Sequence, residues 1–238
     1  MFFSKICWAI KFPSALLLGL GFALWQPLIN AAESPTIIAS PTMDNPKAAS
    51  SLQTTVLAGG CFWGVQGVFE HVRGVRKVVA GYAGGDKTSA NYKTVSSGST
   101  GHAESVQITF DPAVVSYGEL LQIFFSVAHD PTQLNRQGPD TGTQYRSAIF
   151  YTDEAQKNIA QAYIAQLNKS KAFPHDIVTR VDSFKEFYAA EDYHQDFLIH
   201  NPDYHYIVFN DLPKIENLKR MFPNYYLVQA VMLNTNKK

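Results

Sequence analysis

The succession of strand-type and helix-type apolar patterns constrains the fold of this chain more than any other feature. Val106, Ile108 and Phe110 alternate with other residues in "AESVQITFD", as in a half-buried strand. The apolar stretch "SYGELLQIFFSVA" follows at once and reads as a helix, with Ser116 as its N-cap. Such a pair buries the apolar face of the strand against that of the helix. The sequence therefore predicts an α+β fold.

The same patterns continue along the rest of the chain. Further strands are predicted at residues 54–58, 75–83, 145–151 and 176–181, and further helices at 64–72, at 153–170 with Asp153 as N-cap, and near 213–222. A polar loop is expected at 84–101. This order resembles a split βαβ arrangement of the ferredoxin-like kind, a two-layer sandwich, with an irregular C-terminal extension after Glu191.

Residues 1–32 have the layout of a secretory signal peptide. Lys5 and Lys11 precede an apolar run at residues 12–25, and small residues follow at Ala31 and Ala32. A membrane span needs about 20 apolar residues, so this run favours a cleaved leader over an uncleaved anchor. We expect export to a periplasmic or extracellular location, with no stable membrane contact after the leader is removed.

The remaining chain divides by composition into a linker and one domain. Residues 33–51, "ESPTIIASPTMDNPKAASS", are rich in Pro, Ser, Thr and Ala without a sustained period, which predicts a flexible linker. Residues 52–238 form a single domain of conventional size. The chain has 20 basic and 20 acidic residues, so no excess of positive charge recruits nucleic acid.

Cys61 is the residue with the clearest chemical potential. It follows two glycines at the predicted strand-to-helix turn, where free N–H groups and the helix dipole favour an anion and lower the pKa of a thiol. A thiolate at this position is a nucleophile. The alternative, a small buried hydrophobic residue, is equally open from location alone. The neighbouring Phe62 and Trp63 fit either an apolar wall around a reacting atom or ordinary core packing.

Few other residues could form a disulfide or bind a metal ion. Cys7 is the only other cysteine and lies in the predicted leader, so the mature chain cannot form an internal disulfide. His194, His200 and His205 gather near the C-terminus, but their spacing matches no common ligand pattern. No metal site is predicted.

Six short motifs together carry a resemblance to a known family. "GCFWG" at Gly60 resembles the active-site signature of the peptide methionine sulfoxide reductase A family, and the other motifs follow in the family's order. These are "GYAGG", "TGHAESV", "HDPTQ", "QGPDTGTQYRSAIF" and "EDYHQ", and the match covers residues 54–222. Many relatives carry a resolving cysteine in a Gly-rich C-terminal segment, whereas this chain resembles the form that lacks it.

The resemblance implies reduction of the S-epimer of methionine sulfoxide, free or in proteins, and hence repair of oxidised exported proteins. Cys61 matches the family's nucleophile, which ends as a sulfenic acid. Glu104 matches the general acid, a role that requires a pKa raised by burial. The other matching residues are Tyr92 and Tyr145 as hydrogen-bond donors to the sulfoxide oxygen, Phe62 and Trp63 as the pocket for the S-methyl group, and Asp140 as a residue that orients the substrate.

The resemblance also implies partners and leaves two alternatives open. No bound cofactor is expected, and an external thiol, from a thioredoxin-like or glutaredoxin-like protein or from dithiothreitol in vitro, would reduce the sulfenic acid. The protein is expected to be a monomer. The alternatives are an exported binding module for oxidised methionine, and a cysteine hydrolase that would need no added reductant.

Overall fold

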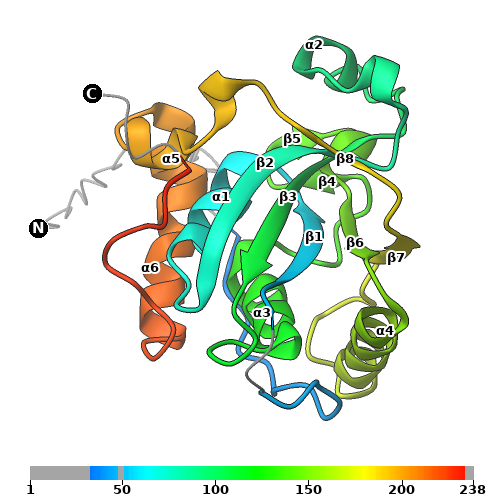
Figure 1. Cartoon of the computed structure of the whole chain (residues 1–238), viewed down its shortest axis with the longest axis vertical. Coiled ribbons are helices and arrows are strands. Elements are labelled where there is room, and N and C mark those ends of the chain that lie inside the picture. The colour runs from blue at the N-terminus through cyan, green and yellow to red at the C-terminus, as the bar shows by residue number, and fades with distance from the viewer. Residues whose placement is uncertain (1–32, 48–50, 234–238) are drawn as a thin grey trace, which may run out of the picture.

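A single six-stranded sheet organises the chain. The computed structural model describes residues 33–47 and 51–233, and its main sheet has the order β7-β6-β1-β3-β2-β8 (Figure 1). All neighbours pair antiparallel except β6 and β7. The strands are β1 (Gln53–Gly59), β2 (Val75–Ala83), β3 (Ala103–Phe110), β6 (Ser147–Tyr151), β7 (Arg180–Ser183) and β8 (Phe187–Ala189). A separate two-stranded ribbon joins β4 (Arg136–Gln137) to β5 (Asp140–Thr141).

The helices pack mainly on one face of this sheet. They are α1 (Phe62–Glu70), α2 (Tyr92–Val95), α3 (Tyr117–Ile123), α4 (Glu154–Lys169), α5 (Phe197–His200) and α6 (Leu212–Met221). Side chains of α1, α3, α4 and α6 join one large buried cluster with Leu57 and Val106 of the sheet. A small second cluster around Val56 and Phe150 lies on the opposite face. Because β1 contributes alternate residues to the two clusters, it is buried on both sides.

Two predicted helix starts are confirmed in atomic detail. The Ser116 side chain accepts a hydrogen bond from the backbone N–H of Glu119, and the Glu119 carboxylate accepts one from the N–H of Ser116, a complete capping box. The Asp153 carboxylate accepts a hydrogen bond from the N–H of Gln156 at 2.8 Å. These contacts satisfy backbone donors that would otherwise lack partners in the first turns of α3 and α4.

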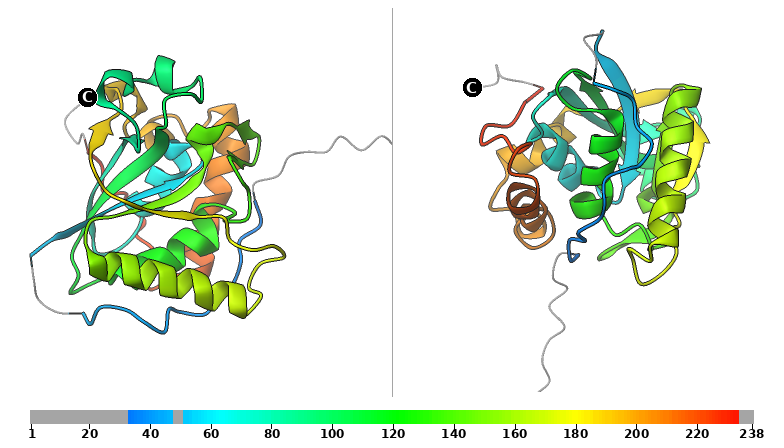
Figure 2. Two further views of the ribbon diagram at one scale, coloured as in Figure 1. Left: turned by 90° about the vertical axis from the view of Figure 1, so that its right-hand side faces the viewer. Right: turned by 90° about the horizontal axis from the view of Figure 1, so that it is seen from below.

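Residues 33–47 differ from the flexible linker that composition predicts. They form an extended segment, called here the strap, which runs past α4 (blue in Figure 2). The Tyr163 hydroxyl on α4 donates to the Ala39 carbonyl at 2.7 Å, the Ile38 side chain is buried, and the N–H of Thr36 donates to the Ser126 carbonyl. Composition missed this order because the strap is fixed by contacts with residues distant in the sequence.

The α+β class is confirmed, and the strand predictions differ from the structure mainly in the last third of the chain. The predicted strand at 176–181 is displaced, since β7 begins at Arg180, and β8 and α2 were not predicted. The region after Glu191 holds more helix than the irregular extension that was expected. The predicted signal peptide lies outside the described residues. Within the residues that are described, no helix has the length and apolar content of a membrane span.

Candidate active site

Cys61 lies at the turn between β1 and α1, as its sequence position predicts. β1 ends at Gly59 and α1 begins at Phe62, so Cys61 is the residue that caps the helix N-terminus. Gly60 before it has a φ of +92°, and a Cβ there would come within 2.5 Å of Cγ of Gln137. Both observations require glycine at this turn. The tight turn leaves the Cys61 side chain only 9% exposed.

The expected lowering of the thiol pKa is wrong. Burial raises the pKa of the Cys61 thiol well above its ordinary value, and the negative charges of Glu104 and Asp211 act in the same direction. A hydrogen bond from the Trp63 backbone N–H in the first turn of α1 opposes this rise. The loss of hydration therefore outweighs the helix N-terminus, and the thiol is protonated at neutral pH.

Glu104 lies next to this turn, buried in the sheet. It is on β3, its side chain is 2% exposed, and its carboxylate accepts a hydrogen bond from the Phe62 backbone N–H at 3.1 Å. Burial raises the pKa of Glu104 to about 8, and the Phe62 N–H offsets part of the rise. The expected rise in pKa is therefore present, and the carboxyl carries a proton at neutral pH.

Tyr92 and Tyr145 approach the same two groups from separate elements. Tyr92 begins α2, where its backbone N–H donates to the Glu191 carboxylate at 2.9 Å, and Tyr145 ends the 3-10 turn Thr143–Tyr145. Burial raises the pKa of both phenols, and the charges of Glu104 and Cys61 raise each further. The ionisation of both tyrosines is thus coupled to that of Glu104 and Cys61, and their hydroxyls remain protonated donors at neutral pH.

Phe62 and Trp63 contribute to an aromatic cluster beside Cys61. The Phe62 side chain is 1% exposed and packs against His194, with ring centroids 5.1 Å apart. Trp63 is half-buried, stacks on Phe197 at 3.8 Å, and donates its indole N–H to Nδ1 of His194 at 3.1 Å. Burial lowers the pKa of His194, so the neutral ring can accept this bond. Phe62 is thus an almost fully buried apolar side chain directly beside Cys61, while part of the Trp63 side chain is exposed to solvent.

Asp140 has a hydrogen-bond partner that sequence reasoning missed. Asp140 begins β5, and its carboxylate accepts a hydrogen bond from the Tyr206 hydroxyl. Burial raises the pKa of Asp140. Tyr206 also lines a pocket together with Cys61. None of the sequence motifs includes Tyr206, and only the aromatic-rich stretch "YHYIVF" could have pointed to it.

A buried ion pair at the start of α6, between its N-cap Asp211 and Lys214, also surrounds the thiol. Lys214 donates to Asp211 at 3.0 Å, and the two side chains are 9% and 0% exposed. A Cβ on Gly64 would lie 2.1 Å from Oδ1 of Asp211, so the pair packs directly on the first turn of α1. Lys214 lies in the helix that the sequence predicts near 213–222, but Asp211 precedes that helix, so the sequence pattern did not indicate this pair. Among the described residues, no group of His, Cys, Asp and Glu side chains is placed to hold a metal ion.

The arrangement combines a nucleophile with a proton donor in a largely dry environment. Cys61 supplies sulfur, Glu104 supplies a transferable proton, and Tyr92 and Tyr145 supply hydroxyl donors. A substrate that needs both nucleophilic attack at one atom and protonation of the oxygen bound to it matches these groups.

Comparison with known proteins gives consistent matches. Residues 53–225 match the family model described as peptide methionine sulfoxide reductase. The chain is 62% identical over 187 residues to "Peptide methionine sulfoxide reductase MsrA 2" of Mesorhizobium japonicum, covering 79% of this chain and 96% of the relative. It is 51% identical over 216 residues to a protein of the same name from Synechocystis sp., covering 90% of this chain and 100% of the relative.

Solved structures of similar fold carry related names. The reduced form of Mxr1 from Saccharomyces cerevisiae matches with a TM-score of 0.58 and 33% identity, covering 67% of this chain and 91% of that one. Methionine sulfoxide reductase A of Corynebacterium diphtheriae matches with a TM-score of 0.55 and 32% identity, covering 73% of this chain and 89% of that one.

Proposed function

Because this chain belongs to the peptide methionine sulfoxide reductase family and is an oxidoreductase that reduces methionine sulfoxide, we propose that it acts on the S-epimer, free or in proteins, through the Cys61 thiol. The observation that carries this proposal is the contact between the Glu104 carboxylate and the Phe62 N–H at 3.1 Å. This contact holds the protonated Glu104 carboxyl at the first turn of α1, which begins at the residue after Cys61.

The reaction balances without a cofactor. The Cys61 sulfur attacks the sulfoxide sulfur, and Glu104 protonates the sulfoxide oxygen as the bond between that oxygen and the substrate sulfur weakens. The bond formed between the two sulfurs then breaks as the protonated oxygen passes to Cys61 and methionine leaves, and the proton released by the thiol restores Glu104. The net change converts one thiol and one sulfoxide into one sulfenic acid and one methionine.

The remaining groups stabilise this transfer. Tyr92 and Tyr145 donate hydrogen bonds to the sulfoxide oxygen as its negative charge grows. Phe62 and Trp63 contact the S-methyl group, and Asp140 orients the rest of the substrate. The comparisons favour neither a binding module nor a cysteine hydrolase.

The second half of the cycle requires an external thiol. Cys61 is the one cysteine in the part of the chain that the structure describes, so no neighbouring thiol there can condense with its sulfenic acid. A thioredoxin-like or glutaredoxin-like protein would reduce it in the cell, and dithiothreitol would do so in vitro.

Location, assembly and topology belong to the same proposal. The leader at residues 1–32 supports export to a periplasmic or extracellular site, where the enzyme, as a monomer, repairs oxidised proteins. The central strand order β6-β1-β3-β2, with α1 between β1 and β2 in the chain and α3 between β3 and β6, supports a ferredoxin-like core.

The test supplies each epimer of methionine sulfoxide with dithiothreitol to the parent chain and to Cys61→Ser. We expect the parent to consume the S-epimer and the variant to consume neither, while circular dichroism reports an intact fold in both. Turnover of the R-epimer alone, or activity of Cys61→Ser above a few per cent of the parent, would overturn the proposed chemistry.

A further inference from the structure

The strap brings a carboxylate to the pocket that contains the proposed nucleophile. Glu33 lines this pocket together with Cys61, Gln137, Tyr206 and Lys214. Glu33 lies outside residues 53–225, the part matched by the family model. The pocket therefore combines a residue of the N-terminal strap with residues of the part that the family model matches.

The Glu33 carboxylate binds the loop of residues 130–140 at three points. It accepts hydrogen bonds from the backbone N–H groups of Asp130 and Gly138, each at 2.8 Å, and from the side-chain amide of Gln133. Hydrogen bonds to an ionised acceptor are stronger than those between neutral groups. One strap residue thus ties together loop positions that are eight residues apart in the sequence.

The loop also has internal contacts, so Glu33 adds to an existing structure. The Asp130 N–H also reaches Oε1 of Gln137 at 2.9 Å, and the Gly138 N–H also reaches Oε1 of Gln133 at 3.0 Å. Removal of the Glu33 carboxylate therefore leaves both amides with an acceptor. The loop would stay folded but would lose its connection to the strap.

The position of this loop affects both sides of the site. Gln137 packs against Gly60, where an added Cβ would meet its Cγ at 2.5 Å, and Gly60 directly precedes Cys61. Asp140, the partner of Gln137 in the ribbon of β4 and β5, accepts a hydrogen bond from the Tyr206 hydroxyl. A displacement of the loop would therefore change the wall around the thiol and the placement of Asp140 together.

The charge of Glu33 is partly balanced within the pocket. Burial raises the pKa of Glu33, while the positive charge of Lys214 and the backbone donors of the loop lower it. Lys214 also pairs with Asp211 at 3.0 Å. The positive charge of Lys214 and the backbone N–H groups of Asp130 and Gly138 thus all stabilise the negative charge of Glu33 at the pocket.

We propose that Glu33 is a positioning residue that holds the loop of residues 130–140 in its substrate-binding place, which makes the strap a part of the active site. The proposal rests on the proposed roles of Cys61 and Asp140. Cleavage of the leader after Ala31 or Ala32 would retain Glu33 in the mature chain.

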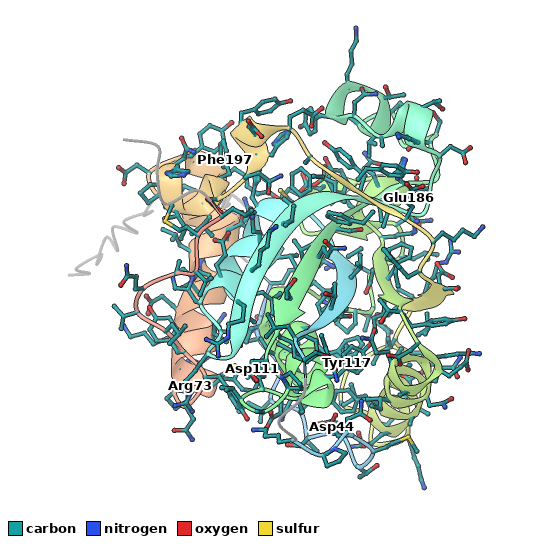
Figure 3. The ribbon with its side chains drawn as sticks, viewed as in Figure 1. Asp44, Arg73, Asp111, Tyr117, Glu186 and Phe197 are labelled. Atoms are coloured by element: carbon teal, nitrogen blue, oxygen red, sulfur yellow. The ribbon has the colours of Figure 1, made fainter. Side chains whose placement is uncertain are left out.

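The experiment compares Glu33→Ala and Glu33→Gln with a matched strap control in the full chain. Asp44 anchors the far end of the strap, where its carboxylate accepts hydrogen bonds from the Gly118 N–H at 2.9 Å and from the Ser116 hydroxyl. Figure 3 shows Asp44 at the opposite end of the molecule from Phe197, which stacks on Trp63. Asp44→Asn should therefore loosen the strap and lower the melting temperature without moving the loop.

The readouts are kcat and KM for a peptide containing methionine S-sulfoxide with saturating dithiothreitol, together with the melting temperature. Glu33→Ala should raise KM about tenfold while kcat changes less than about threefold, because substrate placement is lost and the reacting groups remain. Glu33→Gln should give a smaller rise in KM, since its amide oxygen still accepts one loop N–H. Asp44→Asn should leave KM within about twofold of the parent.

Two results would overturn the proposal. A KM within twofold of the parent for Glu33→Ala would show that the loop does not need the strap. An equal rise in KM for Asp44→Asn would show that the rise in KM of Glu33→Ala comes from a general loss of stability and not from movement of the loop. If Glu33→Ala does not fold, Glu33→Gln decides by the same comparison. Failure of the underlying chemistry would appear separately, as turnover by Cys61→Ser.

Discussion

The backbone N–H of Phe62 donates a hydrogen bond to the carboxylate of Glu104 at 3.1 Å. This bond joins the first turn of α1 to strand β3 of the main sheet. Phe62 directly follows Cys61, so this bond fixes the distance between the acid and the thiol. The acid and the nucleophile come from elements more than 40 residues apart, and both are buried. The proposed chemistry depends on this single junction.

Replacement of Glu104 by glutamine tests the proposed acid. Glutamine keeps the shape of the side chain and can still accept the Phe62 N–H, but it has no acidic proton. We expect kcat for S-sulfoxide reduction to fall by roughly 10²–10⁴-fold, with a smaller change in KM. Steady-state kinetics with saturating dithiothreitol measure both. A near-normal kcat would assign the proton to a tyrosine or to water.

The pH dependence of the first turnover follows from the pKa of Glu104, which burial raises to about 8. The proposed step begins with Glu104 protonated and with the Cys61 thiol protonated, because the thiol proton returns to Glu104, so the rate should hold below this pH and decline as the pH rises through it. The measurement is methionine release in a single turnover without thiol, which avoids titration of the reductant. In Glu104→Gln the decline should be absent, and ionisation of Cys61 should make the residual rate constant or rising. A parent rate that rises through pH 8–9 would contradict this assignment.

The same shift predicts that Glu104→Gln stabilises the folded protein at neutral pH. The ordinary pKa of the carboxyl is 4.5 and the folded value is about 8. Between these values the unfolded chain is ionised and the folded chain is protonated, so the shift opposes folding increasingly from pH 4.5 upward. We expect a gain of up to about 3 kcal/mol in the free energy of unfolding at pH 7 and little gain at pH 4, measured by urea denaturation. Equal gains at the two pH values would refute the linkage.

The local parts of the fold and site were predictable from sequence because their causes are local. The cap at Ser116, the cap at Asp153 and the turn at Cys61 each depend on residues a few positions apart. Glu104 was identified through a family motif. Its burial depends on the sheet, but the alternation along β3 already placed that strand half in the core.

The parts that sequence reasoning missed depend on long-range contacts. Tyr206 reaches Asp140 across 66 positions, and Glu33 reaches Gly138 across 105. No periodicity or short motif connects such pairs. The pKa of Cys61 was mispredicted for a related reason. A helix N-terminus can be read from sequence, whereas the burial that outweighs it, and the charges of Glu104 and Asp211 that add to the rise in pKa, depend on the folded structure.

The most direct test of the account counts methionine released when the mature enzyme meets excess S-sulfoxide without any thiol. With Cys61 as its reacting cysteine, the protein should release about one methionine per molecule and then stop. Intact-protein mass should show one added oxygen, and a sulfenic-acid reagent should label Cys61. Two methionines per enzyme, or a disulfide between Cys61 and a retained Cys7, would contradict the account, because a resolving thiol would then lie within the same chain.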